Sequence, residues 1–116
     1  MKLKVLIIVT SDPRISPRPA EAVRIAAGIG AWQKVEVSLY FRGSAVLALA
    51  ENSEDLVDGE NYVRYLPLVA ESGGNLYAQA GAAALTQLAE TPLKFTAIDD
   101  SQLAELVATN TSVLRF

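Results

Sequence analysis

Hydrophobic and polar residues follow each other along this chain in a pattern that predicts strands alternating with helices. The first strand is an unbroken aliphatic run from Val5 to Val9. A strand without polar positions is covered on both faces, as are the inner strands of a parallel sheet. A polar loop with prolines and two arginines follows it, and a helical pattern then begins at Pro17 or Pro19, since proline is tolerated in the first turn of a helix.

The helix after this loop carries apolar residues around much of its circumference. Because one stripe faces the core and a second lies beside it, we expect this helix to be buried on two sides. Gly28 and Gly30 lie where the helix should end and permit a C-cap. The first stripe consists of Ala20, Val23, Ala27 and Gly30, and the second of Ile25, Ile29 and Trp32.

Residues 34–41 alternate strictly, with Val35, Val37 and Leu39 on one face and polar residues or tyrosine on the other. This alternation predicts a strand with one more polar face, placed nearer an edge of the sheet than the first strand. A turn at residues 42–44 follows, and Ser44 is positioned to be the N-cap of a short helix over residues 45–50.

The rest of the chain repeats the alternation of helix and strand. The fold class predicted is α/β: one domain over residues 1–116, a three-layer α/β/α sandwich with a mainly parallel five-stranded sheet, flavodoxin-like in appearance. The expected elements are a helix over 62–71 interrupted at Pro67, a strand over 76–78 and a turn at 79–81, a helix over 82–90, a strand over 95–98, a helix capped by Asp100 or Ser101 with Leu103, Leu106 and Val107 inward, and a strand over 113–116.

Composition adds expectations about partners and location. An apolar content of 51% is high for 116 residues and leaves room for a second buried surface, so we expect an oligomer. The net charge is −3 and the basic residues are scattered singly, which disfavours nucleic acid and anionic membranes as partners. No apolar run is long enough to span a membrane and no export signal is seen, so the expected location is cytoplasmic.

The chain contains no cysteine and no histidine. Thiolate nucleophiles, disulfides, structural zinc and imidazole acid-base catalysis are therefore excluded within this chain. No metal or cofactor is expected, since the acidic stretch 51–60 lacks the spacing of a calcium loop and no glycine-rich phosphate loop is present. An enzyme using the carboxylates of Asp12, Asp99 and Asp100 is the least favoured interpretation, because nothing separates their pKa values.

Loops at the carboxyl ends of parallel strands are where ligands sit in sheets of this kind. Here those loops place polar residues along one rim, where Ser11 and Arg14 with helix N-termini behind them could hold an anion. The other interpretation is that the arginines are ordinary surface residues and the serines are caps. The candidate ligand-binding residues are Ser11, Arg14, Arg42, Ser44 and Gln79.

Four segments together resemble the DsrE/DsrF-like family, small cytoplasmic sulfur-relay proteins that include TusB, TusC and TusD. They are VLIIVTSDP, VEVSLYFRGSAVLAL, ESGGNLYAQAGAAAL and the final SVLRF. In cysteine-bearing members a persulfide-carrying cysteine lies just after the third strand. The resemblance places Gln79 at that position, or Ala80 if the register shifts by one, and neither can supply a thiolate.

The resemblance also implies assembly, because the family forms trimers, hexamers and mixed oligomers. We therefore expect a non-catalytic DsrE/F-like subunit, either as a homo-oligomer (trimer or hexamer) or as a hetero-oligomer with DsrE-like subunits, associated with sulfur relay through a cysteine-bearing partner. The alternative is a small-molecule or anion-binding module that uses the rim residues. The run from Gly81 to Ala84 would allow close approach either to the chain's own sheet or to another subunit.

Overall fold

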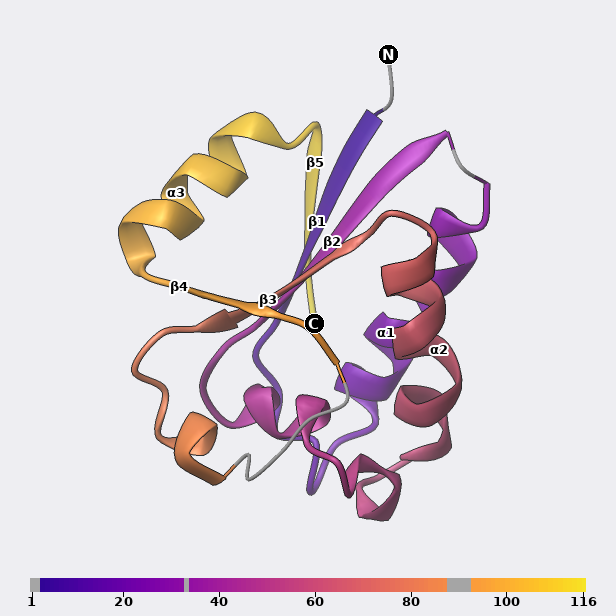
Figure 1. The fold of residues 1–116 in the computed structure, drawn as a ribbon, viewed down its shortest axis with the longest axis vertical. Helices are drawn as coiled ribbons and strands as arrows, with labels where there is room; N and C mark the ends of the chain where they lie inside the picture. The colour runs from indigo at the N-terminus through magenta and orange to yellow at the C-terminus, as the bar shows by residue number, and fades with distance from the viewer. Residues whose placement is uncertain (1–2, 33, 88–92) are drawn as a thin grey trace.

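The computed structural model describes residues 3–32, 34–87 and 93–116. Its centre is one five-stranded sheet in the order β4-β3-β2-β1-β5, and every neighbouring pair of strands is parallel (Figure 1). The predicted parallel sheet is therefore confirmed. The strands are β1 (Leu3–Val9), β2 (Val35–Phe41), β3 (Asn75–Gln79), β4 (Thr96–Ile98) and β5 (Ser112–Arg115).

Helices lie on both faces of this sheet, which confirms the three-layer α/β/α architecture (Figure 1). Helices α1 (Arg18–Gly30) and α2 (Glu60–Glu71) cover one face, and α3 (Asp100–Thr109) lies on the other. Three short 3₁₀ segments complete the described elements: η1 (Gly43–Leu49), η2 (Ser53–Asp55) and η3 (Ala83–Gln87).

The second strand lies in the middle of the sheet, so its predicted position nearer an edge is wrong. Strand β2 pairs with β1 on one side and β3 on the other, and its last five residues are all buried. Its polar residues misled the prediction for two reasons. Glu36 is near the start of the strand, where it is only half-buried, and the buried Ser38 hydroxyl accepts a hydrogen bond from Asn75.

Helix α1 starts where its prolines predicted but is buried on one side only. Residues of the first stripe are buried, whereas Trp32 is 75% exposed and Ile25 is only half-buried. The second stripe instead lines a shallow apolar groove with Gly28 and Val35. The residue after the helix, Ala31, is right-handed helical, so no glycine forms the C-cap.

Helix α2 continues through Pro67 where an interruption was expected. Proline removes one backbone hydrogen bond and displaces a carbonyl one turn earlier. Pro67 and Val63 are both exposed, so the carbonyl of Val63 can be hydrated instead.

The two short helices predicted elsewhere on this side of the sheet differ from the structure. Segment η1 is a 3₁₀ turn preceded by Arg42, and Ser44 makes no capping hydrogen bond, so its predicted N-cap role is wrong. The helix expected over 82–90 is 3₁₀ over Ala83–Gln87, and residues 88–90 lie outside the described residues. Ala82 and Ala84 pack into the chain's own core.

The N-cap of helix α3 is Asp99, which corrects the expectation that Asp100 or Ser101 is the capping residue. The Asp99 carboxylate accepts from the Gln102 backbone N–H at 2.8 Å, and the Gln102 side chain accepts from the Asp99 N–H at 3.0 Å. This reciprocal pair is a capping box. Leu103 and Leu106 face the sheet as predicted, but no residue of α3 is buried and Val107 is 41% exposed.

The two faces of the sheet differ in how completely they are covered. The larger apolar cluster lies between the sheet and helices α1 and α2, and it includes Phe41, Leu39 and Val23. The smaller cluster, under α3, contains four buried residues: Leu6, Ile8, Tyr40 and Ile98. The face under α3 is therefore the more open one.

Tyr62 of α2 is buried in the larger cluster, and its hydroxyl makes no hydrogen bond within the described part of the chain. Burial, with a smaller effect from Asp58, raises the pKa of this phenol. An unpaired buried hydroxyl costs about 1 kcal/mol or more. We expect Tyr62→Phe to raise the free energy of unfolding by about 1 kcal/mol. Urea denaturation followed by circular dichroism measures this change, and a loss of stability would show that the hydroxyl is paired.

Candidate functional site

The carboxyl ends of the strands lie at one edge of the sheet, and the first predicted site residue there has a structural role. The Ser11 hydroxyl donates to the backbone oxygen of Phe116 at 2.8 Å. The Ser11 backbone N–H reaches the same oxygen at 3.4 Å. Ser11 therefore joins the loop after β1 to the residue after β5.

Arg14 is held by a residue two positions before it in the same loop. Its guanidinium donates to both carboxylate oxygens of Asp12, at 3.0 and 2.8 Å, and its backbone N–H donates to Asp12 at 2.9 Å. The Arg14 side chain lowers the pKa of Asp12 and has its own pKa raised in return. This pair satisfies the charge that was predicted to be available for an anion.

Gln79 ends β3 at this edge, and its side chain reaches across to the turn after β2. Its amide oxygen accepts a hydrogen bond from the Gly43 N–H at 2.9 Å. Gly43 has a φ of +59°, a conformation that glycine adopts without strain. The next residue, Ala80, donates its N–H to Ile98 in β4 at 2.8 Å. The amide of Gln79 thus bridges β3 to the segment that follows β2.

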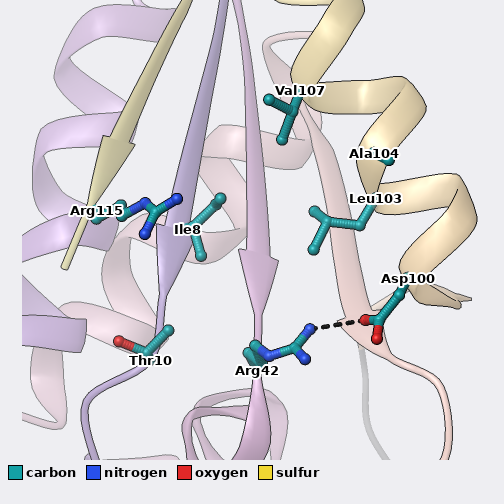
Figure 2. Close-up of a pocket in the computed structure, with 8 residues that line it drawn as sticks. All are labelled: Ile8, Thr10, Arg42, Asp100, Leu103, Ala104, Val107 and Arg115. Carbon is teal, nitrogen blue, oxygen red and sulfur yellow. Dashed lines mark hydrogen bonds and ion pairs between the residues drawn. The ribbon is translucent and has the colours of Figure 1, made fainter.

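Arg42 directly follows β2 and points across the sheet face toward α3 (Figure 2). Its guanidinium donates to the Asp100 carboxylate at 2.9 Å and lies 3.1 Å from the Tyr40 hydroxyl. Both contacts raise the pKa of Arg42, with Asp100 the larger influence. The ion pair connects the end of β2 to the first turn of α3.

A pocket of about 590 Å³ opens between α3 and the carboxyl ends of β1, β2 and β5 (Figure 2). Of the five predicted ligand-binding residues, Arg42 alone lines it. Ser11, Arg14, Ser44 and Gln79 do not. The lining residues are Ile8, Thr10, Arg42, Asp100, Leu103, Ala104, Val107 and Arg115.

Arg115 and Thr10 are pocket residues that the sequence interpretation missed. Arg115 pairs in register with Ile8 of β1, so both side chains lie on the face under α3. The sequence pattern that places Arg115 on the same face as Val113 was present in the final strand, where these two residues alternate with Ser112 and Leu114. Recognising it required knowing that this strand lies beside β1.

The three carboxylates considered for acid-base catalysis are each engaged separately. Asp12 binds Arg14, Asp99 caps α3, and Asp100 binds Arg42. In the ranges 3–32, 34–87 and 93–116, no group of three acidic side chains is arranged to hold a metal ion. The site offers arginines beside apolar surface in place of paired acids.

The profile of the DsrE/DsrF-like family matches residues 3–116. The chain belongs to the DsrE/DsrF-like family. Its fold is similar to that of the ychN protein from E. coli, with a TM-score of 0.81 over 98% of this chain and 99% of that one, at 17% sequence identity. No curated protein matches the chain. The resemblance inferred from the four sequence segments is thus confirmed, as is the α/β fold.

This DsrE/DsrF-like chain has no helix, in the part that the structure describes, of sufficient length and apolarity to cross a bilayer.

Proposed function

We propose that this chain is a DsrE/F-like oligomeric subunit of a cytoplasmic sulfur relay that carries no sulfur itself and acts beside a cysteine-bearing partner. Membership of the family supports the association with sulfur relay. The observation that carries the non-catalytic role is the side chain of Gln79. In the position that the resemblance assigns to the family cysteine, this chain presents an amide whose oxygen accepts from Gly43 at 2.9 Å.

Sulfur transfer requires a thiolate that attacks the outer sulfur of a persulfide and expels the donor thiolate. A glutamine amide has no such nucleophile, and the chain contains no cysteine at any position. The role left to this chain is therefore architectural. It would contribute a surface to an assembly in which another subunit holds the sulfur.

Restoring the thiol tests whether Gln79 occupies the sulfur-carrying position. We expect Gln79→Cys, incubated with a persulfide-loaded cysteine-bearing DsrE-like protein of the same organism, to gain the mass of one sulfur atom. The native chain has no residue that can do so. Intact-protein mass spectrometry under non-reducing conditions measures the gain.

Ser112→Cys is the matched control, because Ser112 is exposed and begins β5. It therefore lies at the amino ends of the strands, whereas Gln79 lies at their carboxyl ends. We expect no sulfur on this variant. Equal labelling of both variants, or none on Gln79→Cys, would refute the assignment. Light scattering after size exclusion tests assembly, where we expect a homotrimer, a homohexamer or a complex with the cysteine-bearing protein. A monomer that does not bind it would refute the subunit role.

Anion binding is the second candidate function, and one observation favours it. The pocket under α3 contains Arg42 and Arg115 beside an apolar wall. The pocket lies at the predicted edge of the sheet and shares only Arg42 with the five residues predicted.

A further inference from the structure

The pocket under α3 is built from two kinds of surface. Its apolar part comes from Ile8 of β1 and from Leu103 and Val107 of α3, which point toward the sheet in Figure 2. Its polar part comes from Thr10, which directly follows β1, and from the arginines. The volume of about 590 Å³ lies within the range of small-molecule sites.

The two arginines stand on opposite sides of the central part of this pocket. Arg115 belongs to β5 and Arg42 follows β2, and these are the two strands that flank β1. The Arg115 side chain extends from β5 over β1 toward Ile8 (Figure 2). Any group seated on the end of β1 would therefore lie between two guanidinium groups.

The charges of the pocket do not cancel. Arg42 is paired with Asp100 at 2.9 Å, which leaves that pair neutral overall. Arg115 has neither an ion pair nor a side-chain hydrogen bond within the described part of the chain. The pocket thus carries one uncompensated positive charge, on a side chain with five N–H donors.

We propose that this pocket binds a small organic monoanion, a carboxylate attached to an apolar body. The carboxylate binds the guanidinium of Arg115, where paired N–H groups match its two oxygens, with the Thr10 hydroxyl nearby. The apolar body packs against Leu103 and Val107. One negative charge neutralises the pocket, whereas a phosphate dianion would exceed it and would leave the apolar wall uncovered.

This site is distinct from the position of Gln79 and does not depend on the proposed sulfur-relay role. Gln79 is not among the lining residues and its amide is engaged with Gly43. A ligand in the pocket would contact both α3 and β5. At this edge of the sheet, α3 is already held by the ion pair between Arg42 and Asp100, and the end of β5 by the hydrogen bond from Ser11 to the Phe116 oxygen.

Titration of the full chain with phenylacetate, followed by ¹H–¹⁵N NMR, tests the proposal. We expect saturable shifts with a Kd of about 1 mM or below, confined to the end of β1, the first two turns of α3 and the end of β5. Inorganic phosphate lacks the apolar body, 2-phenylethanol lacks the negative charge, and phenethylamine carries a positive charge instead. We expect each of them to bind at least tenfold more weakly than phenylacetate.

Removing the charge of Arg115 identifies the anchoring group. We expect Arg115→Gln to weaken phenylacetate binding at least tenfold and Arg115→Lys to restore part of it. Arg64→Gln is the matched control, because it removes the same charge from α2 on the other face of the sheet, and the Kd should not change. Val107→Glu, on an exposed position of α3, places a carboxylate in the pocket and should likewise weaken binding at least tenfold.

The native-like spectrum of each variant establishes that it is folded before its affinity is compared. Shifts that do not saturate, equal binding of 2-phenylethanol, or equal effects of Arg115→Gln and Arg64→Gln would each overturn the proposal. None of these results depends on sulfur transfer to Gln79→Cys, so the two proposals can fail separately.

Discussion

Replacing Gly74 with alanine is expected to lower the free energy of unfolding by about 3 kcal/mol. A Cβ atom at this position would lie 2.7 Å from the carbonyl oxygen of Val69 and 2.8 Å from that of Val37. Both oxygens belong to backbone, one in α2 and the other in β2, so neither can rotate away. Gly74 cannot retreat either, since its N–H donates to the Val69 oxygen at 3.0 Å.

The same substitution at Gly28 provides the control for Gly74→Ala. Gly28 lies within α1, and a Cβ there would meet no atom within 4 Å. Alanine is the better helix former, so Gly28→Ala should raise the free energy of unfolding by about 0.5–1 kcal/mol. Urea denaturation followed by far-UV circular dichroism compares the two variants. A change of the same sign in both would contradict the close approach at Gly74.

Leu39→Ala is expected to cost about 3 kcal/mol of stability. Leu39 is fully buried in β2, between Ile7 of β1 and Leu76 of β3 in the registered sheet. Because β2 has hydrogen-bonded neighbours on both sides and helices above it, the walls of the resulting cavity cannot close. The lost contacts and the empty volume therefore both contribute to the cost.

Leu114→Ala removes the same atoms from an outer strand and is the control for Leu39. Leu114 lies in β5 and is 40% exposed, so we expect its replacement to cost about 1 kcal/mol or less. The difference between the two variants is measured from their urea midpoints with the slope held common. Equal losses would mean that β2 is not the centre of the packed sheet.

The order of elements could be predicted from the sequence because the aliphatic run of β1 directly indicates a buried strand. An unbroken aliphatic run has no soluble face, and the turns and prolines around it delimit the helices. The place of β2 could not be predicted in the same way. Its polar Ser38 suggested an open face, yet the hydroxyl is paired with Asn75, which lies 37 positions later in the chain.

The pocket under α3 lies at the edge of the sheet where the sequence analysis placed its candidate ligand-binding residues, and it shares only Arg42 with them. Ser11 and Arg14 have the side chains expected of an anion site, but both side chains are engaged within the chain. Arg14 pairs with the Asp12 carboxylate, and the Ser11 hydroxyl donates to the Phe116 oxygen. Arg42 lines the pocket, since it directly follows an inner strand. Arg115 joins it only because β5 lies beside β1, a pairing that no local pattern reveals.

The position of β5 beside β1 has a consequence for how the chain assembles. Strand β1 can find β2 early, but its other side stays unsatisfied until β5 arrives, and Ser11 and Phe116 are 105 positions apart. Closing so long a loop is slow, and an open strand edge can meanwhile recruit a second molecule. Docking of α3 and β5 should therefore be the last step of folding. Just before it, nascent or partly denatured chains should be most prone to pair the open side of β1 with a strand of another molecule.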